Sequence, residues 1–258
     1  MRRELTLLHT NDMHDRRSVF PFLEAYPRDA STLLVDAGDA IRGSNTVFRL
    51  HEPILDAMSR VGYDAMAFGN REFNYLRGVL RRRRAQVGFP FVCANVRDLR
   101  GKVNHLWQPT LIKDVGGTRV GFLGLTPVQY LEPSLWQTLF GFEFRRPLDV
   151  LPALVSSLRG QVDVLVLLSH SGFEADCEIA RAVAGIDVIV GGHSHTLLET
   201  PRRVGGAAIV QTGSYGRFVG KMRLRVNEGG GIEIVDYALV PMAGAGVEEA
   251  DRAAEGVA

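Results

Sequence analysis

The sequence has little cysteine and no long apolar run, and each absence excludes a class of protein. Its 258 residues include two cysteines, Cys93 and Cys177, which are too few for a disulfide framework. The first apolar run, Leu5 to Leu8, is too short to form a signal peptide core or a membrane span. We therefore expect a protein without structural disulfides or membrane spans, and we expect it in the cytoplasm.

An excess of charge of one sign is also missing. The formal net charge is +1 and the pI is near 7.9. This balance gives no support for nucleic acid or an anionic membrane as the main partner. One local run of charge, Arg81 to Arg84, could contact phosphate, but the solvated face of a helix over 76–86 is the favoured interpretation.

What the chain does contain is a repeated order of apolar run, polar loop and amphipathic segment. The composition is 46% hydrophobic, which is enough for one sizeable core. Strands are expected at 5–8, 32–35, 64–68, 91–95, 120–125, 162–168 and 186–190, and helices at 20–25, 53–61, 76–86, 148–158 and 174–184. This order predicts an α/β layered fold with a largely parallel sheet in the middle.

Three other segments complete the expected organisation. A hairpin should turn at Gly116-Gly117, and antiparallel strands should follow at 208–211, 218–226 and 232–239. The aromatic residues of segment 128–144 could form a pocket lip, but core positions are favoured for them. We expect a single domain over 1–242 and a loose tail over 243–258.

Polar residues follow five of the expected buried strands. They are Asp12-Met13-His14, Gly38-Asp39, Gly69-Asn70, Ser169-His170 and Gly192-His193-Ser194-His195. In open α/β sheets, ligands bind outside the carboxyl ends of the strands, so these loops should meet at one sheet edge. The loop that contains His193 and His195, called the double-histidine loop below, would by itself fit a solvated polar loop equally well. The other four loops favour a metal site.

The side chains of these loops indicate the kind of metal site. Two carboxylates, four imidazoles and one amide oxygen are too many ligands for one tetrahedral ion, and they suit two divalent cations that share a bridging carboxylate. Nitrogen and oxygen ligands without a thiolate favour Mn, Fe, Co, Ni or Zn over Ca.

Together these motifs resemble a known family. His9-Thr10-Asn11-Asp12-Met13-His14, Gly38-Asp39-Ala40-Ile41, Gly69-Asn70-Arg71-Glu72-Phe73, Ser169-His170, Gly191-Gly192-His193-Ser194-His195 and Gly213-Ser214-Tyr215-Gly216 stand in the order of that family's motifs. Over about residues 4–242 the chain is similar to a calcineurin-like metallophosphoesterase, the catalytic domain of the 5'-nucleotidase, UDP-sugar hydrolase and 2',3'-cyclic phosphodiesterase group.

The resemblance implies a fold and a ligand set. The fold would be a four-layer α/β/β/α sandwich. Asp12, His14 and His195 would hold one metal, Asn70, His170 and His193 would hold the other, and Asp39 would bridge the two ions. The sulfur-ester hydrolases and cyclic phosphodiesterases of the same fold offer an alternative activity.

Two departures from the family pattern bear on the chemistry. Where the family has a histidine that contacts the scissile phosphate and an aspartate that steadies it, this chain has Arg71 and Asn74. Arginine cannot act as a general acid near neutral pH, but its planar fork can neutralise phosphate charge. We expect Arg71 and Asn70 to be catalytic; a structural ion pair is the alternative for Arg71. In a smaller departure, Asp15 takes the place of the glycine that usually follows the first histidine.

The second departure concerns length, because full-size secreted 5'-nucleotidases carry a further domain that grips the base. Here we expect recognition to come from local loops or a partner chain, with Arg42, Asn45 and Asn95 as candidate substrate-binding residues. Arg42 and Asn45 fit ordinary loop residues equally well.

The function expected from the sequence is hydrolysis of a small, nucleotide-like phosphate ester or anhydride by in-line attack of a metal-bridged hydroxide. The alternatives are a phosphodiesterase or sulfur-ester hydrolase on the same fold, and a metal-binding scaffold without turnover.

Overall fold

The computed structural model describes residues 3–43, 49, 51–131, 133–227 and 231–243. Of the expected tail, only Ala243 belongs to this part of the chain, so the predicted boundary at residue 242 stays a prediction. The strands are β1 (Arg3–Thr10), β2 (Thr32–Asp36), β3 (Ala65–Ala67), β4 (Phe91–Val92), β5 (Val96–Asp98), β6 (Thr110–Val115), β7 (Thr118–Leu125), β8 (Phe142–Phe144), β9 (Val164–Ser169), β10 (Val188–Gly191), β11 (Arg202–Val204), β12 (Ala207–Val210), β13 (Phe218–Val226) and β14 (Ile232–Pro241). The helices are α1 (Phe20–Ala25), α2 (Pro53–Val61), α3 (Arg77–Gln86), α4 (Leu135–Phe140), α5 (Pro147–Arg159), α6 (Phe173–Ala182) and the short 3-10 helix η1 (Asn104–Leu106).

Two six-stranded sheets form the centre of the molecule. The first has the strand order β14-β13-β1-β2-β3-β4 and the second has the order β11-β12-β10-β9-β7-β6. Strands β1 to β4 run parallel in the first sheet, and β7, β9, β10 and β12 run parallel in the second. Antiparallel strands close the edges, with β13 and β14 on one sheet and β6 and β11 on the other.

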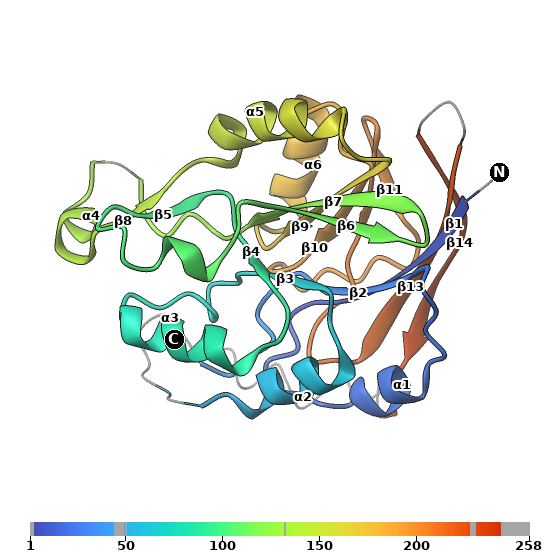
Figure 1. Cartoon of the computed structure of the whole chain (residues 1–258), viewed down its shortest axis with the longest axis horizontal. Helices are drawn as coiled ribbons and strands as arrows, with labels where there is room; N and C mark the ends of the chain where they lie inside the picture. The colour runs from blue at the N-terminus through green and yellow to red at the C-terminus, as the bar shows by residue number, and fades with distance from the viewer. Residues whose placement is uncertain (1–2, 44–48, 50, 132, 228–230, 244–258) are drawn as a thin grey trace.

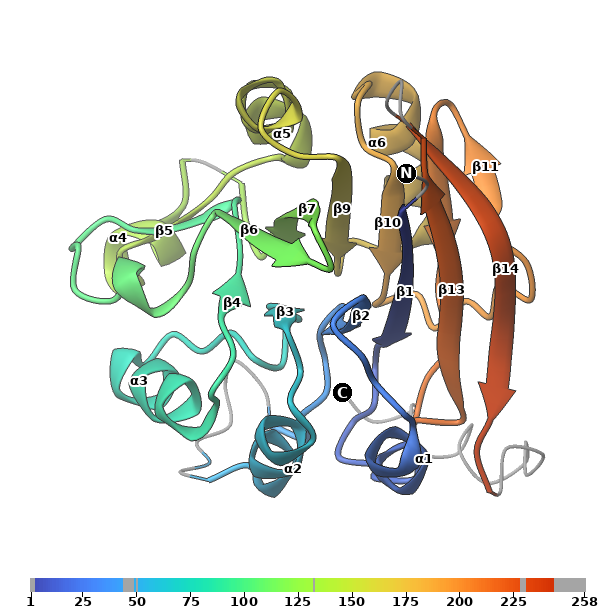
Figure 2. The same ribbon diagram turned by 45° about the vertical axis from the view of Figure 1, so that its right-hand side comes forward.

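Helices cover the outer face of each sheet, as Figures 1 and 2 show, with α1 to α3 on one side and α5 and α6 on the other. The side chains of β1 alternate between two layers, because successive residues of a strand point to opposite faces. Leu5 and Leu7 pack between the sheets, whereas Leu8 packs toward the first three helices. A third cluster, which includes Leu165 and Leu151, joins the second sheet to α5 and α6. The predicted four-layer α/β/β/α sandwich is confirmed.

The expectation of one central sheet is wrong. The five strands with polar ends divide between the sheets: β1, β2 and β3 belong to the first, and β9 and β10 belong to the second. Hydrophobic periodicity shows that a strand is buried but does not show which strand it pairs with. The predicted helices and the hairpin at Gly116-Gly117 are confirmed, with boundaries shifted by two residues at most.

Two further expectations need correction. Segment 128–144 is only partly core: Phe142 is buried, but Trp136 is 56% exposed and stacks on Phe140 at the surface. In the arginine run, Arg81 and Arg82 are exposed as expected, whereas Arg83 is only 1% exposed. The helical period turns one of four adjacent arginines toward the core.

Within the described ranges, no helix combines the length and the apolar character that crossing a bilayer requires. The expected cytoplasmic location stays a prediction.

Candidate metal centre and active site

The five polar loops converge where the carboxyl ends of the two sheets meet. Asp12 and His14 follow β1, Asp39 follows β2, and Asn70 follows β3 in the first sheet. His170 follows β9, and the double-histidine loop follows β10, in the second. The structure therefore brings the seven predicted ligand residues to one rim, although they come from two sheets.

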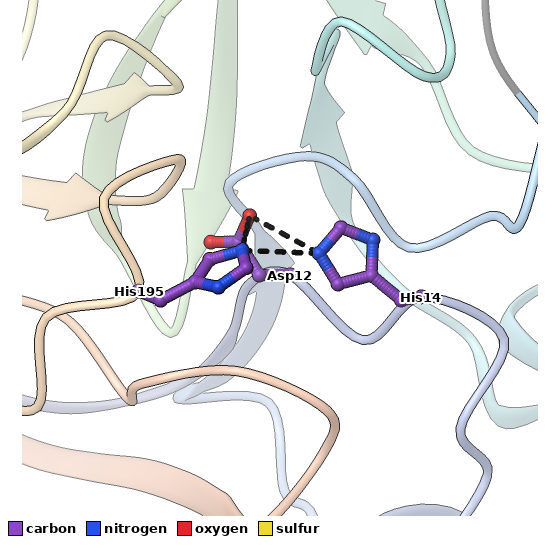
Figure 3. A group of neighbouring side chains, drawn as sticks. All are labelled: Asp12, His14 and His195. Carbon is purple, nitrogen blue, oxygen red and sulfur yellow. Dashed lines mark hydrogen bonds and ion pairs between the residues drawn. The ribbon is translucent and has the colours of Figure 1, made fainter. Parts of the chain in front are cut away.

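Asp12, His14 and His195 form a first group of candidate ligands, shown in Figure 3. One ligand atom of each lies within 4.8 Å of the others. Asp12 Oδ1 is 3.4 Å from His195 Nε2 and 3.8 Å from His14 Nε2, and the two imidazole nitrogens are 3.1 Å apart. Two nitrogens and one carboxylate oxygen that face each other in this way fit a divalent transition metal.

A second group consists of Asp12, Asp39 and His170. His170 Nε2 lies 3.4 Å from Asp39 Oδ2 and 3.7 Å from Asp12 Oδ1. Asp12 thus belongs to both groups, and Asp39 belongs to one. The assignment of Asp39 as the bridging residue stays a prediction.

Asn70 and His193 complete the rim beside the second group. His193 Nδ1 lies 3.1 Å from Asn70 Oδ1, and the rings of His193 and His170 are 5.2 Å apart. The backbone amide of His193 donates to Asp12 Oδ2. Sequence positions 12, 70 and 193 are therefore linked by direct contacts, as the sequence predicts for one site.

The backbone is strained at this rim. Among the described residues, the non-glycine positions with positive φ are Asp12, His14, Asp15, Asp39, His193, His195 and Tyr215. Such conformations cost about 1–3 kcal/mol each and persist only where surrounding structure enforces them. All of these residues lie on the site loops, so the fold maintains strained backbone to aim their side chains.

Two buried atoms test whether the site fits a metal ion. Asp12 Oδ1 and His170 Nε2 are buried without a hydrogen-bond partner, although they face each other across 3.7 Å. The other ring nitrogen of His170, Nδ1, donates a hydrogen bond of 2.8 Å to the carbonyl oxygen of Ala37. A backbone partner of this kind fixes the ring and leaves Nε2 for a metal. These residues fit a divalent cation.

The charges of the site lead to the same conclusion. Burial alone would lower the pKa of His170. The carboxylates of Asp39 and Asp12 outweigh the effect of burial and raise the pKa of His170 to about 10. Burial would raise the pKa of Asp39, but the positive charge of His170 lowers it to about 2. Two buried carboxylates thus require a positive partner. A divalent cation held by Asp12, Asp39 and His170 would supply that charge, and His170 would bind it as the neutral imidazole.

Glu72 supports the rim from behind. Its carboxylate is completely buried and accepts hydrogen bonds from the backbone amides of Asp39, Ile41 and Gly69. The loops after β2 and β3 are thereby held together by one side chain. In the sequence, Glu72 stands within the motif at 69–73, but its residue type alone does not predict this supporting role.

Gly69 makes the close approach of these loops possible. A Cβ atom at position 69 would lie 2.1 Å from Asp39 Oδ1. We expect Gly69→Ala to displace Asp39 and to lower turnover by about 10²-fold, the usual effect of a 1 Å misplacement. The control is Gly78→Ala in α3, where a Cβ meets nothing within 4 Å. It should leave kinetics unchanged and stabilise the fold by about 0.5–1 kcal/mol. Equal activity of the two variants would contradict this prediction.

Asp176 lies behind the double-histidine loop and gives a prediction about pH. It is fully buried on α6, its Oδ2 packs against Gly191, and burial raises its pKa to about 8. An acid whose pKa is higher in the folded chain stabilises folding while protonated. This contribution is complete below about pH 4, the unfolded pKa, and is lost as pH rises through about 8.

We therefore expect Asp176→Asn to gain stability over the parent as pH rises from 5 to 9. The gain in unfolding free energy should exceed about 1.4 kcal/mol, the equivalent of one pKa unit. Urea unfolding with a chelator present measures it. Glu178→Gln, at an exposed position of the same helix, is the control. Parallel pH profiles for the Asp176→Asn variant and the parent would refute the assignment.

A pocket of about 390 Å³ opens beside the first ligand group. Its wall consists of His14, Asp15, Arg16, Arg42, Arg71 and Tyr215. Arg71 Nε lies 3.5 Å from Asp39 Oδ2. Arg71 Nη1 donates a hydrogen bond to the carbonyl oxygen of Arg42. Three arginines around a candidate metal centre favour an anionic ligand.

The three candidate substrate-binding residues fare differently. Arg42 lines the pocket, and its contact with substrate stays a prediction. Asn45 lies outside the described residues. Asn95 is fully buried, and its amide group bonds to backbone atoms of Thr126 and Arg145. These bonds give Asn95 a structural role in joining the ends of β4 and β7, and a substrate contact for it stays untested.

Comparison with known proteins decides the family. The family profile described as Calcineurin-like phosphoesterase matches residues 5–197.

The chain belongs to the calcineurin-like phosphoesterase family.

Named relatives of this phosphoesterase are 5'-nucleotidases. The 5'-nucleotidase of Bos taurus is 32% identical over 89% of this chain, which covers 48% of that protein. The crystal structure of a 5'-nucleotidase precursor from Thermus thermophilus superposes with a TM-score of 0.78 at 30% identity, over 93% of this chain and 55% of the other. The NAD nucleotidase of Haemophilus influenzae, with a TM-score of 0.79 over 94% of this chain and 57% of the other, shares the fold at 24% identity.

The chain spans about half the length of the curated relatives it matches. The predicted family and its 5'-nucleotidase group are confirmed, and so is the assignment to metal-dependent phosphoesterases at the level of the family.

Sequence reasoning missed two residues of the phosphoesterase pocket, Arg16 and Tyr215. Arg16 stands two positions after His14, where the chain bends back at Asp15. Tyr215 belongs to the quoted motif at 213–216, and its ring lies 5.2 Å from that of His14. Tyr215 is far along the chain from the other pocket residues, but the late motif was a usable signal. Arg16 is next to Asp15 in sequence and could have been considered with the first motif.

Proposed function

We propose that this phosphoesterase hydrolyses a small, nucleotide-like phosphate ester or anhydride with two divalent cations. The observation that carries the proposal is the position of Asp12 Oδ1, which faces His14 and His195 on one side and His170 on the other. An arginine-lined pocket adjoins it. This arrangement offers two cation positions beside a place for an anion.

In the proposal, each of the two ions is held by its own set of side chains. Asp12, His14 and His195 would hold one ion, and Asp39, His170, His193 and Asn70 would hold the other, with Asp12 or Asp39 shared. When bound, two such ions lower the pKa of water and neutralise the charge of a phosphoryl group. Mn, Fe, Co, Ni and Zn all suit this donor set.

Arg71 gives the proposed reaction its preference among leaving groups. Its side chain is 39% exposed in the pocket wall, so a bound anion can reach the guanidinium although Asp39 lies nearby. The guanidinium can stabilise charge on the phosphoryl oxygens, but it cannot donate a proton to a departing alkoxide. Phosphoanhydrides, aryl esters and strained cyclic diesters need little protonation and should react fastest.

One experiment tests the proposal directly. The protein is stripped with a chelator, its metal content is measured, and turnover of an aryl phosphate, an aryl phosphodiester and nucleoside mono- and diphosphates is assayed with and without Mn. We expect turnover of a monoester or anhydride that depends on added metal. Turnover of the diester far above that of the monoester would replace the proposal with a phosphodiesterase. Bound metal without turnover of any substrate would indicate a scaffold and contradict the proposal.

A further inference from the structure

Arg83 is a large, fully buried cation that the proposed chemistry does not use. It lies on α3 between the exposed Arg82 and the half-buried Arg84, and its side chain is 2% exposed. Burying a guanidinium is costly unless its charge and its donors are matched. The contacts of Arg83 therefore show what the fold gains from it.

The guanidinium holds the turn that carries Arg71. Arg83 Nη1 donates to the carbonyl oxygens of Arg71 at 2.7 Å and of Glu72 at 2.8 Å, and Phe73 O lies 3.4 Å away. On the opposite side of this turn, the amide of Arg71 donates to Asp39 Oδ1 at 2.8 Å. The peptide units on both sides of the Arg71 Cα are thus fixed, one by the metal-side carboxylate and one by Arg83.

A buried carboxylate accompanies this cation. Glu52 is 0% exposed, and its Oε1 lies 4.0 Å from Arg83 Nη2. Its Oε2 lies 3.4 Å from Arg49 Nη1, so Glu52 stands between two arginines, and neither of its oxygens has a hydrogen-bond partner. A Cβ atom on Gly43 would lie 2.4 Å from Glu52 Oε1 and 2.7 Å from Arg83 Nη2. The buried pair therefore lies beside Gly43, the neighbour of Arg42 in the chain, and Arg42 O in turn accepts from Arg71.

We propose that Arg83 is a positioning residue that fixes the Arg71 guanidinium at the phosphate site, with Glu52 as its buried counter-charge. This inference rests on the proposed function. It identifies Arg83 as the residue that orients Arg71, the arginine that would bind the anion. Arg83 is not among the residues that line the pocket. Its Nη1 donates to backbone carbonyls, whereas its Nε and Nη2 are buried without a hydrogen-bond partner. Its effect must therefore pass through Arg71.

The test begins with three variants of the full chain assayed on an aryl phosphate. We expect Arg83→Met to lower kcat on the order of 10²-fold, the usual result of a displaced catalytic group, with KM and bound metal close to those of the parent. Arg83→Lys keeps a donor for the same carbonyls and should recover most of the lost kcat. Arg82→Met, one position away and exposed, should match the parent. Parent-like kcat for Arg83→Met would overturn the inference.

A double-mutant cycle separates positioning of Arg71 from general loss of structure. In an Arg71→Met background, Arg83→Met should cost less than about threefold, because the group that it positions is absent. Full additivity of the two effects would overturn the inference. If Arg83→Met does not fold, Arg83→Gln, which lacks both the charge and the reach to the same carbonyls, completes the same cycle. A parent protein that hydrolyses no phosphate substrate would contradict the proposed function, whereas an active parent with an additive cycle would contradict the role of Arg83 alone.

Discussion

Replacing Asp12 with asparagine should reduce kcat/KM by about 10³-fold or more, which corresponds to about 4 kcal/mol of transition-state stabilisation. Asp12 Oδ1 is the atom common to both candidate ligand groups, so the substitution removes a charge from both cation positions at once. Metal content measured by mass spectrometry should fall at both positions. By comparison, His14→Ala and His170→Ala each remove a ligand from one group and should each lower the occupancy of one ion.

Fold stability and metal binding must be separated in this experiment. Asn11 Nδ2 and the amide of His193 both donate to Asp12 Oδ2, and an asparagine oriented with its oxygen in that place retains these bonds. The control Glu178→Gln makes the same chemical change at an exposed position of α6. If Asp12→Asn kept two ions and parent-like turnover, Asp12 would not be the shared ligand.

Arg71→His should change which substrates react fastest. A histidine at this position can donate a proton to the leaving group, which typically contributes 10²–10⁴-fold, whereas arginine cannot. We expect the ratio of turnover on a nucleoside monophosphate to turnover on an aryl phosphate to rise by about tenfold or more. The measurement is the dependence of kcat/KM on leaving-group pKa, which should be steep for the parent and shallower for the variant.

The matched comparison is Arg71→Met, which removes the charge and supplies no proton. It should lower turnover on both substrates by a similar factor, on the order of 10²–10³-fold. Asn74 stands three positions after Arg71 and is buried, so Arg71→His with Asn74→Asp tests whether the new ring needs a carboxylate partner. An equal response of both substrates to Arg71→His would remove the proposed basis for leaving-group preference.

The sequence predicts the metal rim well because the signal there is local. Each ligand follows a short β-branched or apolar run within a few residues, and the contacts of His170 with Asp12 and Asp39 agree with the expected convergence. The helices were predictable for the same reason, since α1 and α2 present their apolar residues at helical spacing.

Features that depend on distant partners were not predictable. Apolar periodicity could not show that the rim is built by two sheets, because strand pairing depends on contacts such as those of β1 with β13. Four consecutive arginines have the same chemistry, and only the packing of α3 decides that Arg83 is buried beside Glu52. The pocket residues Arg16 and Tyr215 meet only once β13 has brought the late motif to β1.

The most direct measurement is anomalous diffraction from crystals of the protein loaded with Mn. The account predicts two peaks about 3.5–4 Å apart, the spacing of two-metal hydrolytic sites. One should lie among Asp12, His14 and His195, and the other among Asp39, His170 and His193. A single peak, or two peaks that share neither Asp12 nor Asp39 as a ligand, would contradict the shared-carboxylate arrangement on which the proposed hydrolysis depends.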